Sequence, residues 1–409
     1  MAEQPLKGIR VVDLSRVLAG PWAGQMLADL GAEVIKVERP VTGDESRTYG
    51  AAFLKGPDGE DLRQTPTFLA ANRSKKSVTA NLASPGGQQL VRDLIANADV
   101  VIENYKVGDL ARRGLDYESL KAINPRLIYC SITGFGQTGP YRLRPGYDPV
   151  AQAMSGFMST TGVPDGEPGA GPMKAGPSII DLATGLYASN AILGALYRRD
   201  ARGGGGEYID LSLLDCGVAF TSHYAQQFIL TDEQPRRVGT MGVSGMPGGV
   251  FDCADGKIML AAGTERLFPK LCAILGREDL TTDPRFLTNG LRVTNRNDLI
   301  PILNEELGKW KLADFNDRLI AASIPCAPVN DIAGAFADPQ VQERQMVRTV
   351  PHPRTGTIRL LGNPIQYGTM SANEHRAPPL LGEHEDEILL GLLGYSPERV
   401  AALREAGEI

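Results

Sequence analysis

Hydrophobic and polar positions in the first 135 residues alternate between two periods. Short β-branched runs, typical of buried strands, occur as KGIRVVDL, AEVIKVER, DVVIENY and RLIYCSITGF. Helical stretches such as PWAGQMLADLG lie between them. Strands that alternate with helices in this way predict an α/β fold with a parallel sheet that is covered by helices.

Two helix boundaries are clear in the pattern. Ser84 and Pro85 predict a helix start, because the serine can cap free N–H groups and proline has no N–H to leave unpaired. A long helical pattern, IIDLATGLYASNAILGALYRRD, ends at the glycine run 203–206 and is followed by the alternating EYIDLSLL. Its many small residues favour close packing against another helix.

Glycine and proline divide the rest of the chain. They are frequent at 134–177, which predicts loops over a surface or into a cleft. A second turn-rich passage, GTMGVSGMPGGV, precedes strand and helix patterns that predict a smaller lobe. We therefore expect a large domain that begins with 1–215, a linker helix and small domain at 216–330, and a return segment at 331–409 that completes the large domain.

Composition limits the classes of function. The 409 residues are 42% hydrophobic with a net charge of -6, and they contain no run that approaches the roughly 20 apolar residues of a membrane span. No long basic run favours nucleic acid as a partner. The N-terminal MAEQPLKGIRVVDL passes into a strand pattern without a signal-peptide pattern, so we expect a cytoplasmic protein. An anionic ligand would need local cations.

Several familiar motifs fail in context. The five cysteines are scattered and never spaced as C-x-x-C, which favours buried free thiols over disulfides or a zinc site. GFGQTG at 134–139 fits a dinucleotide fingerprint, but three prolines that follow it prevent the required helix. There is no G-x-S-x-G element, and the four histidines have no metal or triad spacing. We therefore expect no metal site and no nicotinamide site.

Two groups of charged residues have a structural and a functional interpretation. Asp181 lies near the start of the long helix, where a carboxylate either stabilises the free N–H groups or takes part in chemistry. Lys106, Arg112 and Arg113 follow one strand pattern and Arg39 ends another. They are either solvated surface residues or phosphate ligands at the carboxyl edge of the sheet.

The sequence resembles the class III CoA-transferases, also called the CaiB/BaiF family, nearly from end to end. The similar segments are LKGIRVVDLSRVLAGPWAGQMLADLGAEVIKVERP, the ENY-K element at 103–113, INPRLIYCSITGFGQTGP, the D-x-x-TG of 181–185, IPCAPVN and PLLGEH. The resemblance implies a Rossmann-like large domain, a smaller α/β domain and an interlocked, ring-like homodimer. It also implies an enzyme that moves coenzyme A, as a substrate, between carboxylic acids.

The resemblance assigns roles to individual residues. In the family the aspartate of D-x-x-TG is the covalent nucleophile, which is Asp181 here. It forms an anhydride and then an aspartyl-CoA thioester. Apart from the resemblance, each addition builds an oxyanion that needs N–H donors, and glycine lets a backbone approach closely. We therefore expect the glycine-rich segment 242–249, with Gly245, Gly248 and Gly249, to supply them. The residues expected to contact CoA are Leu18, Ala19, Arg39, Ala80, Asn81, Leu82, Ala83, Asn104, Tyr105, Lys106, Arg113, Pro145, Gly146, Tyr147 and Asp148.

Departures from the family pattern narrow the reaction. Racemases of the family have a histidine where this chain has Tyr147. Formyl-CoA transferase has a glutamine where this chain has Leu18. Its glycine run is also altered here to MGVSGMPGG. We therefore expect a succinyl-CoA donor and a dicarboxylate acceptor. The alternatives are a 2-methylacyl-CoA racemase or isomerase, and a non-catalytic CoA-binding subunit.

Overall fold

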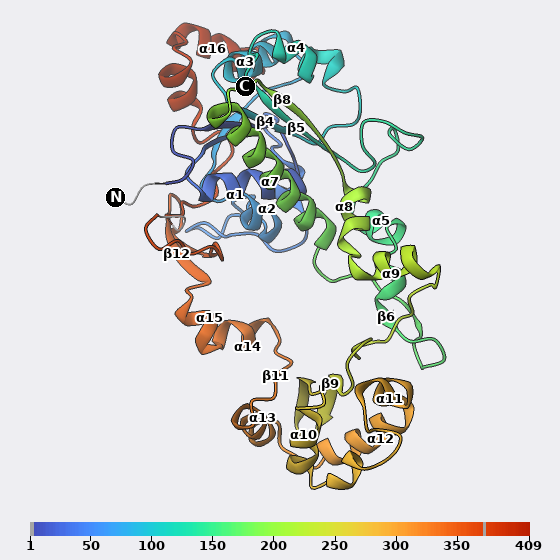
Figure 1. The fold of residues 1–409 in the computed structure, drawn as a ribbon. Coiled ribbons are helices and arrows are strands. Elements are labelled where there is room, and N and C mark those ends of the chain that lie inside the picture. The colour runs from blue at the N-terminus through green and yellow to red at the C-terminus, as the bar shows by residue number, and fades with distance from the viewer. Residues whose placement is uncertain (1–3, 371–373) are drawn as a thin grey trace. The chain divides into compact units, whose positions relative to one another are not determined.

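A computed structural model describes residues 4–370 and 374–409 of the chain (Figure 1). The chain forms two compact units. The large unit contains the chain up to Met158, Lys174–Glu233 and the segment from Gln342 onward, and the small unit contains Ser159–Met173 and Gln234–Val341. The segment Ser159–Met173 thus belongs to the small unit, although it lies within 1–215, which we expected in the large domain.

The large unit is built on a six-stranded sheet whose strands are all parallel. Its order is β3 (Lys76–Thr79), β2 (Glu33–Glu38), β1 (Arg10–Asp13), β4 (Val100–Glu103), β5 (Ile128–Thr133) and β8 (Glu207–Ser212). The order reverses between β1 and β4, as in doubly wound nucleotide-binding folds. This confirms the α/β fold with a parallel sheet. Ligands of such folds bind at the carboxyl edge beside the reversal.

Successive strand residues enter two different cores because their side chains alternate between the faces of the sheet. Val11 packs with helices α1 (Ala19–Asp29) and α7 (Ile179–Ala201), whereas Val12 packs with α3 (Pro85–Ala96) on the other face. The C-terminal helix α16 (Pro397–Glu405) adds Val400 to the second core, beside α3. The end of the chain thus completes the core of the large unit.

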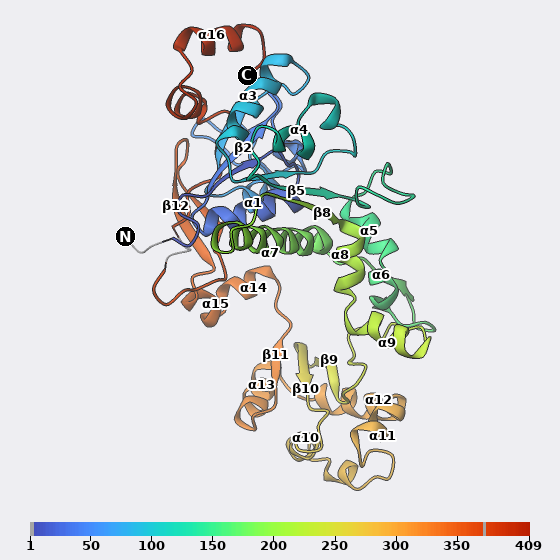
Figure 2. The same ribbon diagram turned by 45° about the horizontal axis from the view of Figure 1, so that its top comes forward.

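Helices α1 and α7 lie side by side on one face of the sheet, as both views show (Figures 1 and 2). A glycine makes their approach close. A Cβ at Gly185 would lie 2.8 Å from the Ala19 carbonyl oxygen and 2.9 Å from the Trp22 ring. The close helix packing predicted from small residues is confirmed at this position, and it brings the start of α1 to the start of α7.

Helix α7 also has the length and composition of a membrane span. Its 23 residues include an 18-residue window of mean hydropathy 1.4, which corrects our expectation that no apolar segment approaches that length. The core helix of a soluble protein can have the same length and hydropathy, so one such helix is weak evidence for a membrane. Here α7 packs against α1, α8 (Leu213–Phe220) and the strands β5 and β8.

Helix starts follow local capping chemistry. The Ser84 side chain accepts a hydrogen bond from Gly87 N–H, and Pro85 opens α3, which confirms that prediction. The prediction of loops throughout 134–177 is wrong in part, since α5 (Asp148–Met154) and α6 (Phe157–Thr160) lie there. Pro149 occupies the first turn of α5, where proline favours a helix start.

The large unit contains further elements outside its parallel sheet. They are α2 (Pro66–Ala71), α4 (Tyr117–Lys121), α9 (His223–Thr231), the antiparallel pair β12 (Val347–His352) and β13 (Gly356–Leu361), the short 3₁₀ turns η1 (Glu45–Thr48) and η2 (Ala111–Arg113), and η4 (Glu387–Leu392).

The small unit has its own core. A three-stranded antiparallel sheet, β9 (Gly248–Cys253), β10 (Gly256–Ala261) and β11 (Cys326–Pro328), is covered by α10 (Phe268–Leu275), α11 (Asn289–Thr294), α12 (Arg296–Leu307) and α13 (Leu312–Ala321). Phe251, Phe268 and Phe315 are buried together in it. The pair β6 (Gly162–Val163) and β7 (Gly171–Pro172) and helix α14 (Ile332–Ala337) belong to the same unit.

Candidate active site

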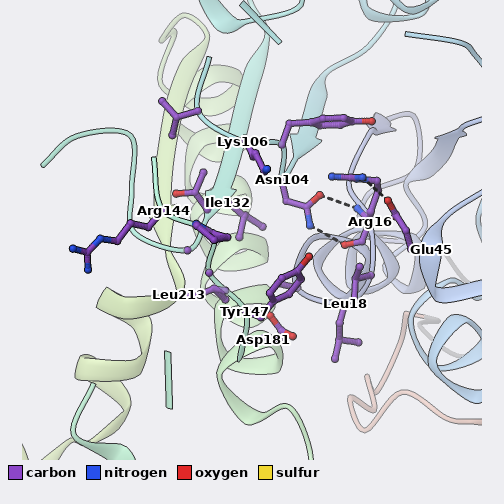
Figure 3. A pocket seen from close by; sticks show the side chains of 18 of the residues that line it. Arg16, Leu18, Glu45, Asn104, Lys106, Ile132, Arg144, Tyr147, Asp181 and Leu213 are labelled. Atoms are coloured by element: carbon purple, nitrogen blue, oxygen red, sulfur yellow. Dashed lines mark hydrogen bonds and ion pairs between the residues drawn. The ribbon is translucent and has the colours of Figure 1, made fainter. Parts of the chain in front are cut away.

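A cavity of about 190 Å³ opens in the large unit beside the reversal of strand order (Figure 3). The loops after β1 and β4 form one side of it, and residues after β5 and at the start of α7 form the other. Asp181, the expected nucleophile, lines this cavity together with eight of the residues expected to contact CoA: Leu18, Ala19, Asn104, Tyr105, Lys106, Pro145, Gly146 and Tyr147.

Asn104 ties the two loops at the reversal to each other. Its side-chain oxygen accepts Arg16 N–H at 2.9 Å, and its side-chain nitrogen donates to the Arg16 carbonyl at 2.7 Å (Figure 3). The Arg16 guanidinium lies over the Tyr105 ring and pairs with Glu45 at 2.5 Å. The loop after β1 therefore has a fixed conformation where it borders the cavity.

Asp181 projects into the cavity from the third residue of α7, beside Tyr147 (Figure 3). Ser178, the N-cap residue of α7, makes no side-chain cap. Asp148 supplies the cap instead, because its carboxylate accepts the N–H groups of Ile180 at 2.7 Å and Asp181 at 3.1 Å. Gln152 holds the other oxygen of Asp148 at 2.6 Å. Asp148 is thus buried behind the cavity and holds the backbone of Asp181.

The Asp181 carboxyl has an unusual acidity. Burial, and then the negative charge of Asp148, raise its pKa to about 7. Within residues 4–370 and 374–409, no hydrogen bond or ion pair engages its oxygens. Glu45, the other acid that lines the cavity, is paired with Arg16. Asp181 is therefore the carboxylate that is free to react, and raised pKa values of this kind are typical of catalytic groups.

Cations surround the outer part of the cavity. Lys106, Arg142 and Arg144 line it, and their side chains are exposed. Arg144 stacks on Tyr141 at 3.7 Å, but none of the three cations has an ion pair within the described part of the chain. Free cations in a protein with a net charge of -6 suit a ligand that carries phosphate groups.

Comparison with known proteins decides the family. The profile of CoA-transferase family III matches residues 6–385. The chain belongs to this family. It is 45% identical over 389 residues to succinate–glutarate CoA-transferase of Agrobacterium fabrum, with 95% of this chain and 96% of the relative covered. It is 40% identical to succinyl-CoA:glutarate CoA-transferase of Homo sapiens, with 99% and 90% covered.

A solved structure supports the same assignment. The CaiB/BaiF family protein of Brucella suis superposes with a TM-score of 0.86 at 43% identity, over 95% of this chain and 99% of that chain. The resemblance to CoA-transferases seen in the sequence is therefore confirmed, and the protein is a CoA-transferase.

The remaining residues expected to contact CoA lie outside the cavity. Arg39 follows β2, has an exposed side chain, and borders a small second cavity. This cavity shares Arg16, Glu45 and Tyr105 with the first, so the two adjoin each other along the carboxyl edge of the sheet. An extended site suits a CoA-transferase, because CoA carries its phosphates far from its thioester.

Arg113 has a structural role in the observed conformation. Its guanidinium donates to the carbonyls of Leu82 at 3.0 Å and Asp109 at 2.9 Å, so it connects the loop after β3 to the loop after β4. Of that first loop, Ala80 is buried, Leu82 packs into the core, and Ala83 is exposed. The neighbouring Arg112 is exposed and pairs only with Asp109 among the described residues.

The glycines expected in an oxyanion loop belong to the small unit. Gly248 and Gly249 open β9, and Gly242 N–H donates to the Gly248 carbonyl at 2.7 Å, which closes the turn that contains Gly245. Gly249 has a φ of 153°, and a Cβ on it would lie 3.0 Å from the Thr240 carbonyl oxygen, so both the backbone conformation and the packing favour glycine there. The oxyanion role of this turn stays a prediction.

Twelve lining residues had not been predicted. Four of them have a sequence feature that marks a site. Arg16 and Val17 follow β1, and Arg142 and Arg144 are charged residues on the proline-rich loop after β5. The set is Arg16, Val17, Glu45, Tyr49, Val107, Ile132, Thr133, Gly134, Arg142, Leu143, Arg144 and Leu213.

Proposed function

We propose that this CoA-transferase moves CoA from succinyl-CoA to glutarate through covalent intermediates on Asp181. The observation that carries the proposal is the Asp181 carboxylate, which is open to a cavity at the sheet reversal and has no protein partner among the described residues. Relatives that are 45% and 40% identical bear the names of succinate–glutarate CoA-transferases, which supports these two acids.

The chemistry needs only the carboxylate and the thioester. Ionised Asp181 attacks the succinyl carbonyl, the carbon–sulfur bond breaks, and a mixed anhydride and CoA thiolate result. The thiolate attacks the aspartyl carbonyl and displaces succinate, which leaves an aspartyl-CoA thioester. Glutarate attacks this thioester and displaces the thiolate, which then takes the glutaryl group from the second anhydride and frees Asp181. Since one thioester replaces another, no external energy source is required.

The fold promotes the reaction mainly by holding the reacting groups in position. Holding a carboxylate against a thioester removes about 7 to 11 kcal/mol of the barrier that an encounter in water would require. Each addition also creates an oxyanion that needs N–H donors. The N–H groups of Leu18 and Ala19, at the uncapped start of α1, have no acceptor in the parts of the chain that the structure describes and border the cavity of Asp181. They are the proposed donors.

The assembly that we propose is a homodimer. The large unit exposes apolar side chains on α7, α8 and α9 that a single chain leaves in water: Leu186, Tyr187, Val218, Phe220, Phe228, Ile229 and Leu230. Many exposed apolar side chains on consecutive helices are typical of an interface. Light scattering during gel filtration should give a mass about twice the 43.9 kDa of one chain; a mass near that of one chain would contradict the proposal.

The test of the acids uses the purified chain alone. With succinyl-CoA and a panel of carboxylic acids, mass spectrometry should detect glutaryl-CoA as the main new thioester. Oxalyl-CoA as the main product would refute the proposed acceptor. Exchange of α-protons with deuterated water in the absence of any free acid would instead favour a racemase, although no histidine is among the described residues that line the cavity.

The test of the nucleophile compares two matched aspartates. Asp181 and Asp215 both occupy the third position of a helix, but Asp215 is exposed and does not line the cavity. Asp181→Ala should reduce transfer at least about 10³-fold, while CoA still binds. Asp215→Ala should retain activity within about threefold. Full activity of the Asp181 variant would refute the mechanism.

A further inference from the structure

The wall of the active cavity contains a residue in an unfavourable backbone conformation. Val17 has a φ of 69°, although its side chain is β-branched, and it lies between Arg16 and Leu18 on the cavity wall. A β-branched residue in this region is a true outlier, and such a conformation persists only where surrounding contacts impose it. Val17 must therefore be held by its neighbours.

A buried carboxylate holds the backbone of Val17. Both oxygens of Asp44 lie within reach of Val17 N–H, at 3.1 and 3.3 Å. Asp44 is 2% exposed and does not line the cavity that contains Asp181. It follows β2 in the segment GDESR, and Glu38 in turn accepts its N–H at 3.0 Å. The strained turn is thus fixed from a different part of the chain.

One buried lysine contacts both the start of the turn, at Ser15, and Asp44, which binds Val17 N–H. The Lys36 ammonium pairs with Asp44 at 2.8 Å and donates to the Ser15 carbonyl at 2.8 Å. Both side chains are fully buried. Burial alone would raise the pKa of Asp44, but Lys36 and hydrogen bonds from Ser46 hold it well below its usual value. Asp44 therefore stays ionised, and a charged acceptor binds an N–H group more strongly than a neutral one.

We propose that Asp44 is a positioning residue for acyl transfer, which holds Val17 and so fixes the N–H groups of Leu18 and Ala19 beside Asp181. This inference rests on the function proposed above. Asp44 lines the adjoining second cavity and not the cavity of Asp181, so its proposed effect on Asp181 passes through the turn. Because a displacement of about 1 Å at reacting atoms can lower a rate about 100-fold, a loosened turn should slow the chemical step rather than weaken CoA binding.

The test is a double-mutant cycle between Asp44→Asn and Val17→Gly. Glycine adopts a positive φ without strain, so the turn no longer needs an external hold when it replaces valine. In single-turnover reactions at saturating succinyl-CoA, Asp44→Asn should lower the rate of acylation about 30- to 100-fold when Val17 is present. In the Val17→Gly background the same change should lower it by no more than about threefold.

Asp29→Asn is the matched control. Asp29 is also a buried carboxylate, and it pairs with the buried Arg73 without contacting the turn. The Asp29→Asn variant should lose about as much free energy of unfolding as Asp44→Asn, but it should retain the acylation rate within about threefold. Equal rate losses from Asp44→Asn with and without Val17→Gly, or a loss no larger than that of Asp29→Asn, would overturn the proposal.

Two further arms keep the outcome decisive. If Asp44→Asn does not fold, Asp44→Glu retains the charge beside Lys36 but displaces the oxygens, and the same cycle applies. The Asp181→Ala variant runs in parallel. If it acylates at the normal rate, the proposed function fails; if it is inactive and the cycle shows no coupling, only the role of Asp44 fails.

Discussion

The two walls of the cavity differ in how firmly they are held. The inner wall, residues 15–19 with Asp181, is fixed by Asn104, Asp44 and Asp148 through hydrogen bonds to its backbone. Within the described residues, no side-chain hydrogen bond or ion pair reaches the backbone of the rim loop, residues 139–147, although Tyr141 packs edge-on against Phe135. The loop is closed at its base. There Gly134 and Gly146 approach so closely that a Cβ on Gly134 would lie 2.7 Å from the Gly146 Cα.

This difference matches two tasks. The inner wall bears the proposed nucleophile and the proposed N–H donors, which would have to hold their geometry during the reaction. The rim loop bears the exposed cations Arg142 and Arg144, which only have to attract an anionic ligand and can do so from a solvated position. Changes in the inner wall should therefore lower kcat, and changes in the rim loop should raise KM.

Among changes that leave the Asp181 carboxylate in place, the largest effect should come from a change of Gly185. In Gly185→Ala the new Cβ would meet the Ala19 carbonyl at 2.8 Å and push α1 away from α7. We expect a loss of about 100-fold in kcat and about 1 to 3 kcal/mol in the free energy of unfolding. Steady-state kinetics and urea unfolding measure both.

Gly194→Ala controls for the helix itself. Gly194 lies on α7 as well, but a Cβ added to it would have no described neighbour within 4 Å beyond its own helix. This variant should gain up to about 1 kcal/mol of stability and keep its kcat. If Gly185→Ala kept its kcat as well, close contact between α1 and α7 would not be needed for the reaction.

A smaller effect should follow from Asp148→Asn. Burial and Asp148 raise the pKa of Asp181 to about 7, and the ionised form is the proposed nucleophile, so kcat/KM should rise with pH through about 7 and then level off. Removing the negative charge of Asp148 favours ionised Asp181, so the rise should move to lower pH. Because the cap is also weakened, we expect about a tenfold loss of kcat at about pH 8.

Asp331→Asn provides the comparison for this pH profile. Asp331 caps α14 in the small unit through Gly334 N–H at 2.7 Å. Its loss should leave the pH profile unchanged. A profile for Asp148→Asn that does not move, or moves to higher pH, would contradict the electrostatic role of Asp148.

The smallest effect should come from the rim loop. Arg142→Gln and Arg144→Gln should each raise KM for succinyl-CoA about threefold with little change in kcat, and the increase should shrink at high salt. Arg202→Gln is the control, because Arg202 is also exposed and lies over a tyrosine, Tyr197, but does not line the cavity. A fall in kcat without a change in KM would break the comparison of the two walls.

Much of this architecture follows from short-range patterns. The strand and helix periods predict the parallel sheet, and Ser84–Pro85 predicts the start of α3, because local chemistry determines both. The resemblance to CoA-transferases pointed to Asp181, whose position in the helix alone left a structural role open. The resemblance also assigned residues of both loops, after β1 and after β4, to the CoA site, and the structure brings these loops together.

The features of the site that the sequence did not predict depend on contacts between distant parts of the chain. Asp148 was expected to contact CoA, but the structure buries it as the cap of α7, and Asp148 and Ile180 are 32 positions apart. Val17 has a positive φ that no sequence rule assigns to valine, and its N–H is bound by Asp44, which lies 27 positions away. The pairing of Arg16 with Glu45 likewise arises only once β1 and β2 lie side by side.

The most direct test of the mechanism looks for the acyl group on the protein. The enzyme is mixed with succinyl-CoA alone, treated with borohydride or hydroxylamine, digested and mapped by mass spectrometry. Covalent catalysis predicts a reduced or hydroxamate-modified residue at Asp181 and at no other carboxylate. An unmodified peptide around position 181, from a sample that still exchanges CoA at its full rate, would contradict it.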